Sequence, residues 1–329
     1  MRKYIHLIFL ITFISYAQEP AIQEEDRVMI SEAFRISGLY GNELWDGWDM
    51  APFALILVYD DYEFLINHPS PSDDFKLIGF DSILNSQVYY RNRQFSTQFL
   101  ATFPAVGGVQ TIVVGTSENT GKSSAEWILT ILHEHFHQFQ YSQPDYYSSI
   151  NALDLSGGDE TGMWMLNYPF PYENQNVNAV YDSCKKILAC IFVNNKEPDM
   201  NLYLSYLKNR DQLKNILSEE DYKYISFQLW QEGIARYTEI KLLQMMLVDG
   251  YEFSDEVKKL RDYKSLKDHY EDYYTNEINL LNGLSLRDSK RNCFYEFGAF
   301  EGLLVDLVNP GWRKEYLTRK FFIENYYTD

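Results

Sequence analysis

Residues 133–137 read His-Glu-His-Phe-His and match the pattern H-E-x-x-H. On an α-helix, side chains four residues apart lie on one face, so His133 and His137 could bind a single metal ion together. Glu134 would lie about 100° around the helix from His133. From there its carboxylate could approach a water molecule on that ion without binding the ion. Two imidazole ligands and a nearby carboxylate base are the arrangement used in zinc-dependent hydrolysis.

The residues around this pattern predict the helix that it needs. Ser123 and Glu126 have the spacing of a capping box, in which the serine caps the first turn and the glutamate reaches back to it. The apolar residues that follow recur at near-helical spacing, and Pro144 ends the segment. The sequence therefore predicts a helix over about residues 124–141.

A strand is the competing interpretation of the same segment. In a strand, His133, His135 and His137 would alternate with other residues and share one face. The capping box and the Trp-Ile-Leu run before the histidines argue against this interpretation. Histidines with a purely structural role are the remaining alternative.

A catalytic zinc site needs a third protein ligand. No histidine follows at the short spacing of H-E-x-x-H-x-x-G-x-x-H, so that class of site is excluded. The sequence instead offers Glu232, within the helix-like run LWQEGIARYTE at residues 229–239. Glu232, Arg236 and Glu239 would share one face of this helix. An ordinary amphipathic helix with a solvated Glu-Arg-Glu stripe is the alternative, and spacing alone leaves both open.

The two motifs together resemble the gluzincin zinc metallopeptidases, especially bacterial peptidase-like domains. They are H-E-x-x-H at residues 133–137 and W-x-E-G-x-A-x-Y-x-E at residues 230–239. The resemblance implies a zincin-like fold in which Glu232 is the third zinc ligand, beside His133 and His137. It also implies that Glu134 is the general base.

The resemblance extends to the surroundings of the site. Similar proteins place an edge strand just before the metal helix to pair with extended substrate, which here would correspond to residues 110–115. The chain also departs from the family, because His137 and Glu232 are 95 residues apart in the sequence. Thermolysin-like relatives carry an acidic residue shortly after the ligand glutamate, and it orients a histidine. Four positions after Glu232, however, this chain has Arg236. Glu239 would then take that role.

Hydrolysis through a tetrahedral intermediate requires a donor near the developing oxyanion. Tyr295, Tyr237 and Arg236 are the candidates. The Tyr-Glu-Phe-Gly segment at residues 295–298 resembles a helix start of the same family, which favours Tyr295. Because the chain contains 27 tyrosines, a structural role is the alternative for any one of them.

The chain before the metal helix reads as a helix over about residues 26–37 followed by short strands. Asp60 and Asp61 lie between two of the strands and indicate a hairpin. From Ser123 onward the pattern turns helical, apart from a polar stretch over residues 143–178. We therefore expect an α+β fold, with a mainly antiparallel sheet lobe (18–122) packed on the metal helix. A helical lobe (123–329) carries both motifs, and residues 18–329 form one zincin-like unit. The expected strands cover residues 53–59, 62–67, 87–91, 97–102 and 110–114.

The N-terminus has the features of a secretory signal peptide. Arg2 and Lys3 precede an apolar run that ends near Tyr16, and Ala17 is a small residue at a plausible cleavage site. The run is too short for a comfortable membrane span. We expect removal of residues 1–17, export to the periplasm or the cell exterior, and no stable membrane insertion of the mature protein. A buried N-terminal strand or a retained anchor is the alternative.

Charge and glycine spacing argue against nucleic-acid and nucleotide binding, and the cysteines leave the disulfide pairing open. The net charge of −18 repels phosphate backbones, which argues against nucleic-acid binding. The glycines before the metal helix lack the spacing of a phosphate-binding loop, which argues against nucleotide use. The three cysteines, Cys184, Cys190 and Cys293, cannot all pair. A local bridge within the helix-like stretch of the first two is disfavoured, whereas pairing of either with Cys293 stays open.

These observations predict an exported zinc-dependent hydrolase that cleaves peptide bonds, with Zn²⁺ as cofactor and peptides or proteins as substrates. One alternative is a non-catalytic binding or scaffold protein on the same fold. Another is a zinc hydrolase that acts on a non-peptide amide.

Overall fold

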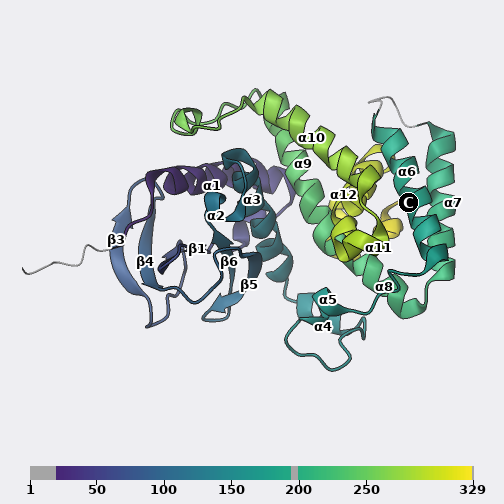
Figure 1. Ribbon diagram of the computed structural model, residues 1–329, viewed down its shortest axis with the longest axis horizontal. Helices are drawn as coiled ribbons and strands as arrows, with labels where there is room; N and C mark the ends of the chain where they lie inside the picture. Colours follow the sequence, from purple (N-terminus) through teal and green to yellow (C-terminus); the bar gives the residue numbers. More distant parts are fainter. Residues whose placement is uncertain (1–19, 194–198, 328–329) are drawn as a thin grey trace, which may run out of the picture.

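The computed structural model describes residues 20–193 and 199–327. A six-stranded sheet in the first third of the chain is followed by a mainly helical part, and the two lie side by side along the molecule (Figure 1). The expected α+β fold is confirmed. The predicted signal peptide over residues 1–17 lies outside the described residues, and the extent of one unit over residues 18–329 stays a prediction.

The sheet is mixed and mainly antiparallel, with the strand order β3-β4-β2-β1-β6-β5. Among the strands of the described residues, only β1 and β6 pair in parallel, and the predicted hairpin joins β1 to β2. The sequence pattern misses β3, because most of its side chains are exposed or only partly buried and do not alternate. The strands are β1 (Leu55–Val58), β2 (Tyr62–Ile66), β3 (Lys76–Asp81), β4 (Ser86–Asn92), β5 (Leu100–Val106) and β6 (Val109–Gly115).

Helices α1 (Glu24–Leu44) and α3 (Ser124–Tyr141) cover one face of the sheet (Figure 1). Leu55 and Leu57 of β1 join these helices in the main hydrophobic core, whereas Ile56 and Val58 belong to a smaller core. A strand buried on both faces explains the continuous apolar run in the sequence. α1 is longer than the predicted helix over residues 26–37.

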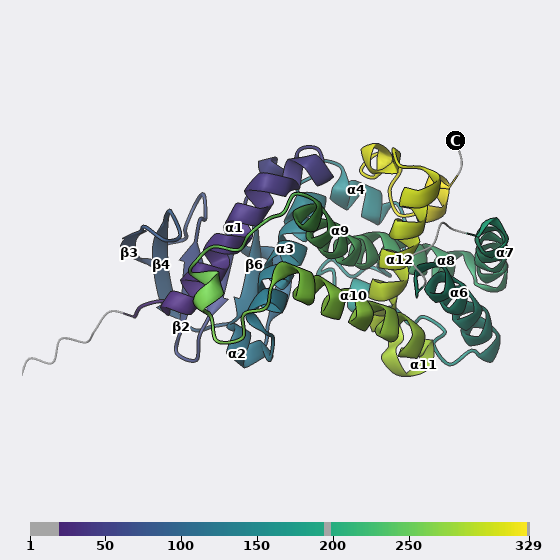
Figure 2. The ribbon, with the colours of Figure 1, turned by 90° about the horizontal axis from the view of Figure 1, so that it is seen from above.

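The helical part packs around α9 (Ile234–Val248) and α12 (Cys293–Val308). Seen from above, α3 lies between the sheet and helices α9 and α10 (Figure 2). The polar stretch over residues 143–178 contains two short helices, α4 and α5, and the start of α6. The other helices are α2 (Ser117–Thr120), α4 (Tyr146–Asn151), α5 (Trp164–Asn167), α6 (Gln175–Val193), α7 (Met200–Ile216), α8 (Glu219–Gln228), α10 (Leu266–Gly283) and α11 (Leu286–Ser289).

The prediction that residues 110–115 form an edge strand is wrong. They belong to β6, which lies between β1 and β5. The chain reverses at Gly107 and Gly108, both of which have positive φ and suit a tight hairpin. Because β1 pairs with one side of β6 and β5 with the other, β5 is the edge strand beside the metal helix.

The three cysteines are free thiols, so the question of a bridge to Cys293 is answered in the negative. Cys184 and Cys293 are buried, and Cys190 is exposed. Within the described part of the chain, no helix is long and apolar enough to cross a membrane.

Candidate metal centre

His133 and His137 come from α3, and both are buried. The predicted helix and its capping box are confirmed. The Ser123 side chain accepts a hydrogen bond from the Glu126 main-chain N–H, and the Glu126 carboxylate accepts one from the Ser123 N–H. The four-residue spacing brings the Nε2 atoms of the two histidines within 3.1 Å of each other. A strand with three alternating histidines is therefore excluded.

Glu232 reaches the histidines from a separate helical rod. It lies in η2 (Leu229–Gly233), a π-helical turn between α8 and α9. Its Oε2 lies 3.3 Å from His137 Nε2 and 3.7 Å from His133 Nε2. One ligand atom from each of the three residues lies within 4.8 Å of the others, so the group could hold a metal ion. π-Helical turns occur often at functional sites.

Contact between two glycines sets the position of α12 against this rod. A Cβ atom on Gly233 would lie 2.4 Å from the Gly298 Cα, closer than any side chain tolerates. The backbones therefore touch at this crossing, and Tyr295, one turn before Gly298, reaches the site. The Tyr295 ring stacks on the His133 ring with centroids 6.0 Å apart.

The Nδ1 atom of His133 contacts the Glu239 carboxylate at 2.6 Å. The other oxygen of Glu239 accepts hydrogen bonds from the Tyr273 hydroxyl at 2.6 Å and from Arg236 at 3.1 Å. Burial alone would raise the pKa of Glu239. The charge of Arg236 and the hydrogen bond with His133 outweigh burial and lower this pKa to about 2. An ionised carboxylate thus receives the Nδ1–H of His133, the arrangement found behind many metal-binding histidines.

The Nδ1 atom of His137 has an uncharged partner instead. It lies 2.7 Å from Gln140 Oε1 and 3.1 Å from Gln231 Nε2, both atoms of neutral amides. The Gln140 amide in turn donates to the Tyr316 hydroxyl at 2.6 Å and to the main-chain oxygen of Gln231 at 3.1 Å. These donor bonds fix the orientation of the amide, so its oxygen is the atom that faces the imidazole.

These partners determine which atoms the histidines present to each other. With Nδ1–H donating to Glu239 or Gln140, each Nε2 carries a lone pair. Two lone pairs and the Glu232 carboxylate then converge, and either a metal ion or, in its absence, a proton on His133 Nε2 would neutralise them. Burial disfavours a charged His133, but hydrogen bonds with Glu232 and Glu239 outweigh it and raise its pKa to about 9. Burial would raise the pKa of Glu232, yet the two histidines hold it well below the ordinary value. The donor set therefore fits a divalent metal ion.

Glu134 does not join the ligand set and lies toward the edge of the sheet. The Thr102 hydroxyl, on edge strand β5, lies 2.9 Å from both Oε2 and the main-chain oxygen of Glu134. Glu134 is buried, with 6% of its surface exposed. The carboxylate is thus held between the metal helix and β5.

His135 has a structural role. Its ring stacks on Phe53 with centroids 3.7 Å apart and also on Trp48 at 5.3 Å. Its Nδ1 lies 2.8 Å from Gln138 Oε1. Burial lowers the pKa of His135 to about 3, so the ring is neutral at physiological pH.

The structure brings most of the predicted site residues together, with two exceptions among the oxyanion donors. Tyr237 donates to Asp306 at 2.8 Å, away from the histidines. Arg236 lies behind Glu239 rather than beside the ligands.

Sequence reasoning missed three residues of the site. Arg291 lies 3.3 Å from the Tyr295 hydroxyl and 3.7 Å from Glu232 Oε1. Thr102 comes from a distant strand, and no local pattern marks either residue. Gln140 was detectable in principle, because it follows His137 by three residues and therefore lies on the same face of α3.

Searches against protein-family models, curated proteins and solved structures return no match for this chain.

Proposed function

We propose that this protein is a zinc-dependent hydrolase that cleaves peptide bonds. One observation carries the proposal. Two imidazole nitrogens and a carboxylate converge within 4.8 Å. A further carboxylate, that of Glu134, follows the first histidine directly on the same helix. This combination provides three ligands and a separate base, as hydrolysis by a metal-activated water requires.

His133, His137 and Glu232 would hold the ion, with Glu239 and Gln140 fixing the imidazoles. When bound, zinc would polarise the scissile carbonyl and make a water molecule acidic near neutral pH. The Glu134 carboxylate would take a proton from the attacking water and pass it to the nitrogen of the leaving amine. Thr102 donates to the same carboxylate and would restrict its rotation.

Tyr295 and Arg291 supply donors beside the ligands, from the start of α12 and the turn before it. The Tyr295 hydroxyl and the Arg291 guanidinium contact each other. Both are partly exposed, so substrate could reach them. We assign to Tyr295 the stabilisation of the developing oxyanion, with Arg291 holding its hydroxyl in place.

Edge strand β5 supports a peptide as the substrate. It is paired only with β6 among the described residues, and its Thr102 contacts the proposed base. An extended peptide that added to this edge through main-chain hydrogen bonds would run past Glu134.

The predicted signal peptide would place this activity outside the cytoplasm. N-terminal sequencing of the exported protein tests whether residues 1–17 are removed.

Metal content and turnover of matched variants test the proposal. The wild type should bind about one zinc per chain, and His137→Ala and Glu232→Ala should lose most of it. Glu134→Gln should retain zinc and lose turnover of a broad peptide library by roughly 10²–10⁴-fold. Full activity of Glu134→Gln would refute the mechanism. Zinc binding without peptide turnover would favour a scaffold or a non-peptide amide hydrolase.

A further inference from the structure

A cavity of about 440 Å³ lies beside the metal centre, between α3, α9 and α10. Glu126 and Thr130 of α3 line it, on the same helix face as His133 and His137 and one to two turns before His133. Glu239, the partner of His133, also lines it. Thr130 on its wall precedes Glu134 by about one helical turn, or about 6 Å along the helix axis.

Two buried polar atoms on the wall of this cavity lack a hydrogen-bond partner. His269, Tyr273 and Glu277 of α10 are spaced by four residues and share the face that lines it. Glu277 is 2% exposed and His269 is 5% exposed, yet neither Glu277 Oε2 nor His269 Nε2 has a hydrogen-bond partner. Glu277 Oε2 forms only a long ion pair, with Arg236 Nε at 3.7 Å. Buried polar groups are nearly always paired, so these atoms point to a ligand with hydrogen-bond donors.

The charges around the cavity favour a cation as that ligand. Five carboxylates and three cationic side chains line it. Deeper in the protein, the single guanidinium of Arg236 interacts with Glu239, Glu277 and Glu296, all of them buried. Lys264 on the wall is already paired with Asp272 at 2.7 Å. The buried carboxylates thus outnumber the cation among them.

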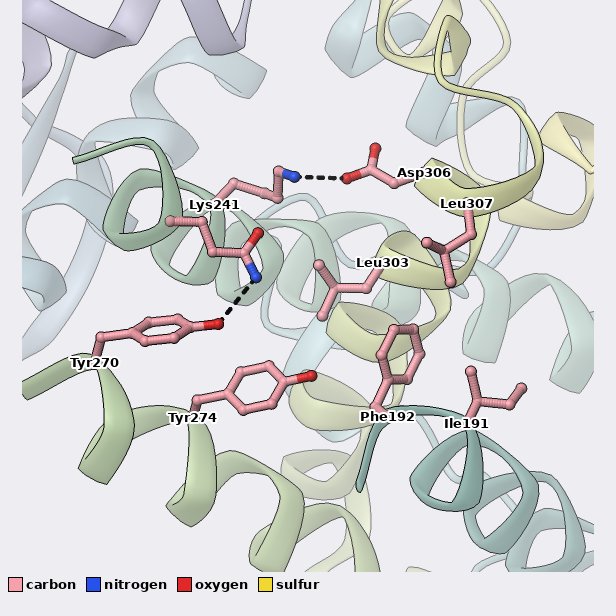
Figure 3. Close-up of a pocket in the computed structure, with 9 residues that line it drawn as sticks. Ile191, Phe192, Lys241, Tyr270, Tyr274, Leu303, Asp306 and Leu307 are labelled. Atoms are coloured by element: carbon pink, nitrogen blue, oxygen red, sulfur yellow. Dashed lines mark hydrogen bonds and ion pairs between the residues drawn. The ribbon is translucent and has the colours of Figure 1, made fainter. Parts of the chain in front are cut away.

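A second hollow, of about 250 Å³, shows the contrast (Figure 3). It lies on another face of α9 and α10, and its two charged side chains pair with each other. Lys241 pairs with Asp306 at 3.0 Å, and Gln244 donates to Tyr270 at 3.2 Å. The paired charges on its wall give no reason to expect a charged ligand.

We propose that the first cavity receives a lysine or arginine side chain of the substrate bound at the metal centre. This inference rests on the proposed function and names its substrate class. A basic side chain can cover the distance along α3 with its apolar stem and carry its charge to Glu277. His269 Nε2 would accept a second hydrogen bond from the same group.

Matched peptides test this assignment. The zinc-loaded protein would be assayed with peptides that carry lysine, or uncharged norleucine, at each position around the cleaved bond. We expect lysine to be preferred at one position by at least tenfold in kcat/KM. Glu277→Gln should reduce this ratio at least tenfold, as should Asn276→Lys, which places a fixed cation at an exposed position of the wall. Glu271→Gln and Thr275→Lys, exposed on the same helix and outside the cavity, should retain the wild-type ratio.

Binding separates this inference from the proposed function. The same peptides would be titrated by calorimetry into the zinc-loaded Glu134→Gln variant, with and without Glu277→Gln, after metal analysis shows equal zinc in both. Tighter binding of the lysine peptide that depends on Glu277 supports the cavity even if no peptide is cleaved. Cleavage without a preference for lysine, or a preference that Glu277→Gln leaves intact, overturns the cavity assignment and leaves the peptidase proposal standing.

Discussion

The two histidines of the metal centre lie four residues apart on one helix, yet their surroundings differ in kind. His133 faces a charged region, in which Glu239 is bonded to Arg236 and Tyr273 and borders a cavity. His137 faces an uncharged region, in which the fully buried Gln140 is bonded to Tyr316 and to main-chain oxygens.

This difference suggests two separate tasks. A carboxylate behind an imidazole increases its basicity and so strengthens metal binding. An amide held by packed aromatic residues adds no charge, and it fixes the ring through geometry alone. The charged region can therefore adjust the affinity for the metal ion and interact with substrate, whereas the uncharged region fixes the position of the His137 ring.

Giving the uncharged region a charge is expected to have the largest effect. In Gln140→Glu, a carboxylate oxygen replaces an NH₂ group that donates to Tyr316 and to Gln231. It would face acceptor oxygens in a position with no exposed surface, so we expect the free energy of unfolding to fall by about 3–5 kcal/mol. Urea denaturation measures this, with the exposed Gln175→Glu as control. An equal effect of both substitutions would remove the distinction between the two regions.

The opposite exchange should weaken metal binding rather than folding. Glu239→Gln retains an acceptor for His133 Nδ1–H but removes the negative charge behind it. We expect zinc affinity to fall by about 10–100-fold. Competition with a chelator measures this, and Glu271→Gln, exposed on α10, is the control. An affinity within twofold of the wild type would show that charge behind His133 has no influence on the ion.

Removal of a carboxylate at the border of the cavity should alter the pH dependence of stability. Burial raises the pKa of Glu277 to about 7, against the lowering effect of Arg236 and with Glu296 and Glu239 adding to the rise. Between its ordinary pKa and about 7, the folded protein holds more protons on this group than the unfolded chain does. Stability is therefore lost as pH rises through this interval.

The Glu277→Gln variant should not lose stability in this way as the pH rises. Its free energy of unfolding relative to the wild type should increase by about 2 kcal/mol between pH 5 and pH 8. Thermal or urea unfolding at both pH values measures the change, again with Glu271→Gln as control. A difference that is constant with pH would mean that Glu277 titrates as it does in the unfolded chain.

Local signals predict the metal helix well. The capping box at Ser123, the apolar spacing and Pro144 define α3 within a residue or two of its observed bounds. The assignment of Glu232 needed a motif as well as spacing, because a solvated stripe has the same period. The role of Glu239 followed from the same resemblance, and its position on the helix face of Glu232 is consistent with it.

What the sequence could not show depends on contacts between distant segments. Strand order decides which strand forms the edge, and the parallel pairing of β1 with β6 leaves no local trace. Arg291, in the 3₁₀ turn Lys290–Asn292 before α12, and Thr102, in β5, reach the site only because these segments are packed against it. The exposed β3 lacks the alternation that marks a half-buried strand.

The π-helical turn at Leu229–Gly233 has a consequence for changes in chain length. Such a turn contains one residue more than an α-helical turn, so it corresponds to a single-residue insertion in a regular helix. Deleting one residue there would restore a continuous α-helix from α8 to α9. It would also turn α9, and Glu239 with it, by about 100° relative to α8. Homologous proteins with a metal site of this geometry should therefore conserve the length of this turn, together with Glu232 and Gly233.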